Sequence, residues 1–188
     1  MKLSWSQKLF LRINKTLGQR PLLDKFMYFC GQWLIFVLGG VLGILFLLFL
    51  PKEQYLFFLI GVSSIFLLAY GISYTIAIIL KHPRPIRELP NVKELIIPLE
   101  TWKSFPSDHT IAVTLLTVFS WYATYSLPLV ICMAIGALFV MAGRVYCGVH
   151  YPRDIIGGII VALLSTAIIV FGFVFFEVFV VGGVTITN

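Results

Sequence analysis

Two short polar segments carry side chains whose types and spacing suit the handling of a phosphate group. The first is Ser104-Phe-Pro-Ser-Asp-His109, and the second is Arg144-Val-Tyr-Cys-Gly-Val-His150-Tyr-Pro-Arg-Asp154. Together they hold two of the three histidines of the chain and two of its eight acidic residues. Both lie at the edge of long apolar segments, where ionisable groups are costly and usually functional. Their clustering therefore predicts a chemical site.

A histidine and a carboxylate four residues apart can act as a nucleophilic pair. His150 precedes Asp154 at this spacing, and a carboxylate on one ring nitrogen fixes the tautomer and leaves the other nitrogen free to attack. His109 could then protonate the departing oxygen as a general acid. We therefore expect these three residues to be catalytic.

Cations and hydrogen-bond donors near these residues could hold a phosphate. Arg84 and Arg144 each present a planar fork that fits phosphate oxygens. Ser107 offers a hydroxyl, and the backbone N–H of Asp108 would point at an anion from a helix N-terminus. Each residue alone also has a plainer explanation: a snorkelling arginine, a helix N-cap or a first-turn acid. Their joint occurrence favours phosphate binding.

The composition is that of an integral membrane protein. The 188 residues are 60% hydrophobic, and the mean hydropathy is +0.99, far from the range of soluble domains. We expect one membrane-embedded domain, residues 1–188, with no appended soluble module. The net charge of +6 suits anionic lipid headgroups or phosphorylated substrates, and nucleic acid is a poor partner because no soluble domain presents a basic face. Three cysteines without a CxxC pair indicate neither a disulfide framework nor a zinc site.

The hydropathy pattern predicts an all-α bundle of about five transmembrane helices. Residues 1–25 are expected to contain an interfacial amphipathic helix, because apolar side chains recur there every four residues from Trp5 to Leu17. A solvated basic tail is the alternative. The spans are expected at 26–50, 55–80, 110–126, 128–143 and 155–176, with 81–107 as a loop on the side of the site.

Alternating these spans across a membrane brings the polar segments together. The end of the second span, the start of the third, the end of the fourth and the start of the fifth all fall on one side. Residues 81–85, 107–109 and 144–154 should therefore converge at one interface. The hydropathy alone did not require this agreement, which strengthens the prediction of a single site.

The three segments resemble the signature of a known enzyme family. Arg84-Pro85, Pro106-Ser107-Asp108-His109 and Arg144-x5-His150-x3-Asp154 are similar, in order and spacing, to the motifs of the type 2 phosphatidic acid phosphatase superfamily, which also includes vanadium-dependent haloperoxidases. The resemblance implies a phosphohistidine intermediate on His150, an orienting Asp154 and an acid, His109. It also implies chemistry without a metal or other cofactor, and a phosphate held by Arg84, Ser107 and Arg144.

Three positions depart from the family pattern. The family lysine seven residues before the first arginine is Ala77 here, and Lys81, one helical turn further on, is expected to take its place. The usual glycine before the first histidine is Asp108, whose carboxylate would repel a phosphate unless it is turned away or paired with a cation. The usual serine before the third-part arginine is Gly143.

The motif variant most resembles bacterial undecaprenyl-diphosphate phosphatases of the bacitracin-resistance type. That implies removal of a terminal phosphate from a lipid diphosphate in the bacterial inner membrane. Lipid A 1-phosphatases and phosphatidylglycerophosphate or phosphatidate phosphatases share the core motifs and stay open as alternatives. A transporter would place ionisable residues at mid-span, where this chain has almost none. A catalytically impaired, lipid-binding family member is the other non-enzyme alternative, and the intact His109, His150 and Asp154 argue against it.

The charge distribution and the resemblance disagree about orientation. Thirteen Lys and Arg residues lie on the side of the motifs and one, Lys52, lies on the other. The positive-inside rule would place the site in the cytoplasm, whereas the resemblance implies the outer face, which we expect. The sequence does not indicate an oligomeric state.

Overall fold

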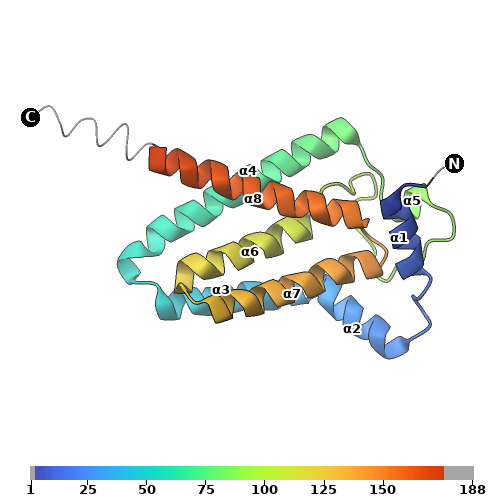
Figure 1. The fold of residues 1–188 in the computed structure, drawn as a ribbon, viewed down its shortest axis with the longest axis horizontal. Coiled ribbons are helices and arrows are strands. Elements are labelled where there is room, and N and C mark those ends of the chain that lie inside the picture. The colour runs from blue at the N-terminus through green and yellow to red at the C-terminus, as the bar shows by residue number, and fades with distance from the viewer. Residues whose placement is uncertain (1–2, 176–188) are drawn as a thin grey trace, which may run out of the picture.

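The computed structural model describes residues 3–175, and this range contains helices and loops without strands. The helices are α1 (Trp5–Asn14), α2 (Pro21–Gln32), α3 (Leu34–Phe49), a 3-10 turn η1 (Lys52–Gln54), α4 (Tyr55–Leu80), α5 (Pro85–Glu88), α6 (Asp108–Thr124), α7 (Leu127–Tyr146) and α8 (Pro152–Phe175). Figure 1 shows the long helices side by side, with α1 and α5 gathered at one end of the bundle. The expected all-α architecture is confirmed.

Several of the described helices could cross a membrane. Three segments are long and apolar enough to do so alone: Lys52–Glu88, Leu127–Tyr146 and Pro152–Val174. Helices α2 and α3 meet at a 49° bend and can count together as a fourth. The chain is therefore a multi-pass membrane protein. The first expected span differs from a straight 26–50 helix, because α2 begins at Pro21 and the helix breaks at Trp33. Helix α6 has only 17 residues, so the count of five spans stays a prediction.

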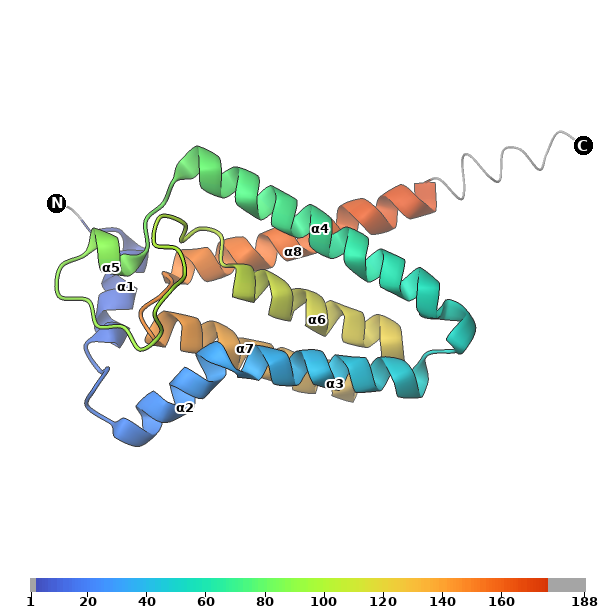
Figure 2. The same cartoon turned by 180° about the vertical axis from the view of Figure 1, so that it is seen from behind.

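Helix α6 lies at the centre of the bundle. It packs against α3, α4, α7 and α8, and both views show it between α4 and α7 (Figures 1 and 2). Its Ile111, Val113 and Leu115 are fully buried, as expected of a helix that is apolar on most sides. The outer faces of α4 and α8 instead expose side chains such as Leu67 and Leu164, which suits contact with lipid.

The N-terminal helix α1 supports the loops at the end of the bundle. A capping box between Ser4 and Gln7 starts the helix. The Gln7 amide then donates to Glu88 Oε1 at 2.8 Å, and Phe10 packs edge-on against Tyr151 with ring centroids 5.3 Å apart. Because Tyr151 directly follows His150 in the chain, α1 braces the segment that carries the predicted nucleophile.

One face of α1 stays exposed. Trp5 and Leu9, which belong to the predicted apolar stripe, are largely exposed, whereas Ser6, Gln7, Phe10 and Asn14 form the buried face. Only the first part of the apolar stripe read from the sequence is therefore exposed, because Ile13 and Leu17 pack into the protein. An exposed tryptophan and leucine beside basic residues suit a membrane surface, so the interfacial location stays a prediction.

Candidate active site

His150 lies in the loop between α7 and α8, deeply buried. Its Nδ1 is 3.0 Å from the carbonyl oxygen of Ser104. Because a carbonyl oxygen can only accept, Nδ1 carries the proton and Nε2 carries the lone pair in the neutral ring. Burial lowers the pKa of His150 to about 4, although Asp154 acts to raise it. The ring is therefore neutral at pH 7, as a nucleophile requires.

Asp154 is fully buried behind His150 and is tightly held. Its Oδ2 accepts hydrogen bonds from Ser104 Oγ at 2.5 Å and from the Tyr151 backbone N–H at 2.8 Å. The same oxygen is 3.6 Å from His150 Nδ1, so the sequence-predicted pair is brought together. The shorter bond from the ring goes to the Ser104 carbonyl. Ser104 therefore holds both members of the pair, a role that the sequence analysis did not find.

Arg84 lies against the free nitrogen of His150. Its Nη1 is 3.2 Å from Nε2, and the guanidinium is anchored by donating to two carbonyl oxygens, those of Val149 at 3.0 Å and Glu100 at 2.6 Å. The backbone N–H of Arg84 also donates to Thr101 O at 3.0 Å. A phosphorus atom attacked by Nε2 would thus lie beside this cation.

Arg144 projects from the last turn of α7 and is 4% exposed. Its Nη1 donates to the carbonyl oxygen of Gly31 on α2 at 3.1 Å. Burial of an arginine costs free energy unless its charge is paired with an anion or with hydrogen-bond acceptors. Since this single hydrogen bond leaves Nε without a partner among the described residues, the guanidinium retains capacity for an anion.

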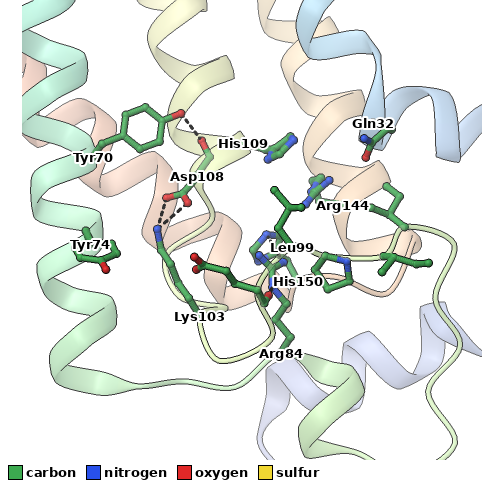
Figure 3. Close-up of a pocket in the computed structure, with 14 residues that line it drawn as sticks. Gln32, Tyr70, Tyr74, Arg84, Leu99, Lys103, Asp108, His109, Arg144 and His150 are labelled. Carbon is green, nitrogen blue, oxygen red and sulfur yellow. Dashed lines mark hydrogen bonds and ion pairs between the residues drawn. The ribbon is translucent and has the colours of Figure 1, made fainter.

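His150, Arg84 and Arg144 face one cavity of about 590 Å³ (Figure 3). Of the residues predicted from sequence, five line it: Arg84, Asp108, His109, Arg144 and His150. Its other walls come from Gln32, Tyr70, Tyr74, Glu100, Lys103 and the segment 96–99. The segment 96–99 forms an apolar rim, on which Ile97 and Leu99 are strongly exposed.

Three predicted residues are not among those that line the cavity. The Asp154 carboxylate lies next to His150 Nδ1 and does not face the cavity. Ser107 is the buried N-cap residue of α6 and donates its N–H to the Asp154 carbonyl at 3.1 Å, while its hydroxyl has no partner within residues 3–175. Lys81 is the exposed, left-handed C-cap of α4 with φ of 46°. The structure therefore does not bring Lys81 into the site.

The cation that pairs with Asp108 is Lys103. Its Nζ is 2.7 and 2.8 Å from the two carboxylate oxygens, and Ser73 Oγ donates to the same carboxylate at 2.7 Å. From the sequence, Asp108 was expected to be either turned away or paired with a cation, and Lys81 rather than Lys103 was expected in the site. The available signal was the short separation, five residues, between Lys103 and Asp108 in the chain.

The charged groups of this cavity suit anion chemistry. Two arginines and a lysine line it together with two histidines. Across the part of the chain that the structure describes, no three His, Cys, Asp or Glu side chains gather where they could hold a metal ion. A neutral nucleophilic imidazole beside fixed cations has the parts that phosphoryl transfer needs. Fold and site together thus define the class as a membrane-embedded phosphatase.

Comparison with known proteins agrees with this class. The PAP2 superfamily matches residues 54–177, which include all three motifs, and the chain belongs to this superfamily. YbjG of Escherichia coli (strain K12) is 28% identical over 159 residues, covering 84% of this chain and 77% of that protein. Undecaprenyl-diphosphatase BcrC of Bacillus subtilis (strain 168) is 27% identical over 172 residues, covering 90% of this chain and 82% of that protein.

A solved structure shows the same fold. The crystal structure of Aquifex aeolicus LpxE aligns with a TM-score of 0.69 at 22% identity, over 90% of this chain and 96% of that one. The superfamily match over residues 54–177 confirms the family resemblance read from the motifs. The protein is a PAP2 lipid phosphatase, a phosphoric ester hydrolase.

Proposed function

We propose that this phosphatase removes the terminal phosphate of a lipid diphosphate, with undecaprenyl diphosphate as the preferred substrate, through a phosphohistidine on His150. The observation that carries the proposal is the hydrogen bond from His150 Nδ1 to the Ser104 carbonyl at 3.0 Å, because it leaves Nε2 unprotonated, with its lone pair on the side of Arg84. The name of the BcrC relative supports the substrate. So does the apolar rim beside a cationic cavity, which suits a lipid with a charged head.

In the first step, the Nε2 lone pair of His150 attacks the terminal phosphorus. A P–N bond forms, the bond from phosphorus to the bridging oxygen breaks, and its electron pair leaves with the lipid monophosphate. His109 lines the cavity; the negative charge of the bound substrate favours its protonated form, which gives its proton to the departing oxygen. Arg84 and Arg144 offset the charge on the equatorial oxygens of the transferred group.

In the second step, water attacks the phosphohistidine. His109 accepts a proton from that water, the P–N bond breaks, and inorganic phosphate leaves with His150 restored. The imidazole carries positive charge while it is phosphorylated and protonated at Nδ1. The buried Asp154 carboxylate, 3.6 Å away, stabilises that charge. No step of this scheme needs a metal.

A labelling experiment tests the scheme directly. The purified protein is mixed briefly with undecaprenyl diphosphate labelled in its terminal phosphate, and then quenched with alkali, in which phosphohistidine survives. We expect label on the wild-type protein and none on His150→Ala. Unlabelled wild-type protein that still releases phosphate would contradict the covalent intermediate.

Phosphate release from four lipids identifies the substrate. The panel is undecaprenyl diphosphate, lipid A, phosphatidylglycerophosphate and phosphatidate, each with and without EDTA. We expect the highest kcat/KM on the diphosphate and no effect of EDTA. Higher activity on lipid A or on a glycerophospholipid would reassign the substrate, and release from none of the four would favour a lipid-binding protein.

We further propose that the site faces outward from the bacterial inner membrane, against the count of positive charges. The bacterial origin of the relatives supports a bacterial membrane, and the outer face rests on the family resemblance alone. The exposed Arg87 lies on the side of the site, so an Arg87→Cys variant in a Cys132→Ser background reports its orientation. Labelling of intact cells by a membrane-impermeant maleimide would support the outer face. Labelling only after lysis would place the site in the cytoplasm.

A further inference from the structure

Lys103 is a buried cation that the scheme above does not use. The residue is 7% exposed and lines the same cavity as His109 and His150. Its ammonium contacts both oxygens of Asp108 and lies 5.9 Å from the ring centroid of Tyr74. Neighbouring Trp102 packs edge-on against Tyr74 with centroids 6.3 Å apart, which docks this part of the loop onto α4. A lysine held this firmly in a cavity wall is not a snorkelling surface residue.

The position of Lys103 relates it to the leaving group. Nε2 of His150 has Arg84 at 3.2 Å, so the transferred phosphorus lies on the Arg84 side of the cavity. Asp108, to which Lys103 is bound, directly precedes the proposed acid His109. Figure 3 shows Lys103 and Asp108 toward α4 and Arg144 on the other side of His109. The ammonium therefore lies on the α4 side of the cavity, opposite Arg144 and bound to the residue that precedes His109.

The position of Lys103 matters because the leaving groups of lipid monophosphates and lipid diphosphates differ in charge. Hydrolysis of a lipid monophosphate releases a neutral alcohol. Hydrolysis of a lipid diphosphate releases a phosphate that becomes more negative as the bridging bond breaks. The cavity volume of about 590 Å³ is that of a site for a whole small ligand rather than for one phosphate. A diphosphate therefore has room to place its second phosphate beside Lys103.

Asp108 would oppose such a substrate if it stood alone. Its side chain is 37% exposed, and a carboxylate facing a phosphate is repulsive. The paired lysine cancels that charge, and Ser73 holds the carboxylate on the side of α4. The flexible stem of a lysine allows its ammonium to contact a phosphate oxygen while it stays near its carboxylate.

We propose that Lys103 binds the phosphate of the leaving group and so makes the site selective for lipid diphosphates over lipid monophosphates. The inference rests on the proposed function and adds a second phosphate subsite to it. In the transfer step the electron pair of the broken P–O bond goes to the departing lipid phosphate. The Lys103 ammonium offsets that added charge, and Asp108 and Ser73 position the ammonium.

The test compares two substrates that share one polyprenyl chain, a diphosphate and a monophosphate. Lys103→Met keeps most of the length of the unbranched side chain and removes the charge. Lys103→Met/Asp108→Asn removes both charges of the pair. Lys52→Met removes an exposed lysine at the opposite end of the bundle and serves as the matched control. For each variant, kcat/KM is measured on both substrates.

We expect Lys103→Met to lower kcat/KM on the diphosphate by at least about 10-fold more than on the monophosphate, as for a lost charged hydrogen bond. The double variant should keep that selective loss, and Lys52→Met should match wild type. Activity of Lys103→Met on the monophosphate shows that the variant is folded.

Three results would overturn the inference. An equal loss on both substrates would assign Lys103 to the transferred phosphate. Recovery of diphosphate activity in the double variant would mean that Lys103 only neutralises Asp108. A Lys103→Met variant with wild-type kinetics would remove it from the site. In all three cases the wild-type protein would still hydrolyse the diphosphate and would still be labelled on His150. If the proposed function were wrong, the wild-type protein itself would fail one of these two measurements.

Discussion

Gly31 and Gly143 meet backbone to backbone where α2 crosses α7. A Cβ atom added to Gly143 would lie 2.5 Å from Gly31 N and 2.9 Å from Met27 O, both of which are backbone atoms that cannot rotate away. This close approach is what places the Gly31 carbonyl within 3.1 Å of Arg144 Nη1. It also gives a physical reason why position 143 departs from the serine that the family pattern has there.

Gly143→Ser should therefore push α2 away from α7 and displace Arg144. We expect a loss of stability of about 1–3 kcal/mol, as for other overpacked sites, and a lower kcat/KM. Thermal unfolding in detergent and phosphate release measure the two effects. Gly43→Ser is the control, because nothing lies within 4 Å of a Cβ at that position. Equal behaviour of the two variants would contradict the close contact.

Asp154→Asn should move the acid limb of the pH–rate profile to lower pH. The Asp154 carboxylate favours the protonated imidazole and so raises the pKa of His150, which burial lowers to about 4. Without the carboxylate the pKa should fall further, so the nucleophile stays neutral in more acidic buffer. The rate itself should drop, since the phosphorylated ring loses its counter-charge. Single-turnover rates measured from neutral pH to well below pH 4 on one substrate give the shift, because ionisation of the substrate is common to both enzymes. A shift to higher pH would be the wrong sign for this geometry.

Ser104→Ala should reduce kcat with little change in KM. The variant removes the 2.5 Å hydrogen bond to Asp154 Oδ2 but keeps the backbone carbonyl that orients His150. A buried carboxylate that loses one partner costs about 1–3 kcal/mol, and about 1.4 kcal/mol of this in the transition state gives a tenfold fall in kcat. Ser107→Ala is the comparison, because the family resemblance gives that hydroxyl a phosphate contact and predicts a change in KM. If the two variants shift the same kinetic constant, their roles are not distinct.

His109→Ala should depend on the leaving group. A general acid matters most when the departing oxygen is strongly basic, so the loss on a lipid monophosphate should be about 100-fold or more. On p-nitrophenyl phosphate, whose leaving group needs no proton, the loss should be much smaller. Comparing kcat/KM on the two substrates measures the difference. An equal loss on both would make His109 a phosphate-binding residue instead.

Lys81→Met should change kcat/KM by less than about twofold, as for most substitutions of exposed residues. The side chain is exposed and is not among those that line the cavity. The sequence-based expectation was a substitute for the family lysine, which predicts a loss of about tenfold or more. Kinetics together with the folded yield of this variant decide between the two, and a tenfold loss would return Lys81 to the site.

The bundle and the convergence of the motifs could be predicted from the sequence because lipid constrains both. Long uncharged segments such as 55–80 must be helical in a membrane, and their alternation fixes which ends meet. The bend at Trp33 was not predictable, since the uncharged run of residues 26–50 continues through it.

The loop from residue 81 to residue 107 is where sequence reasoning failed. No periodicity orients side chains there, so Lys103 could not be distinguished from Lys81. The groups that hold His150 and Arg84 are mostly backbone carbonyls, those of Ser104, Glu100 and Val149. Every residue type has such a carbonyl, so no pattern of residue types could reveal them.

The apolar rim formed by residues 96–99 has a consequence for how this enzyme meets its substrate. Ile97 and Leu99 are strongly exposed beside a cationic cavity. The apolar rim can therefore contact acyl chains of the bilayer while the charged residues line the cavity below it. A substrate would then arrive by lateral diffusion within the bilayer. The concentration that governs the rate is accordingly the mole fraction of substrate among the surrounding lipids. Added detergent or lipid should dilute it in two dimensions and raise the apparent KM, even at a constant molar amount of substrate.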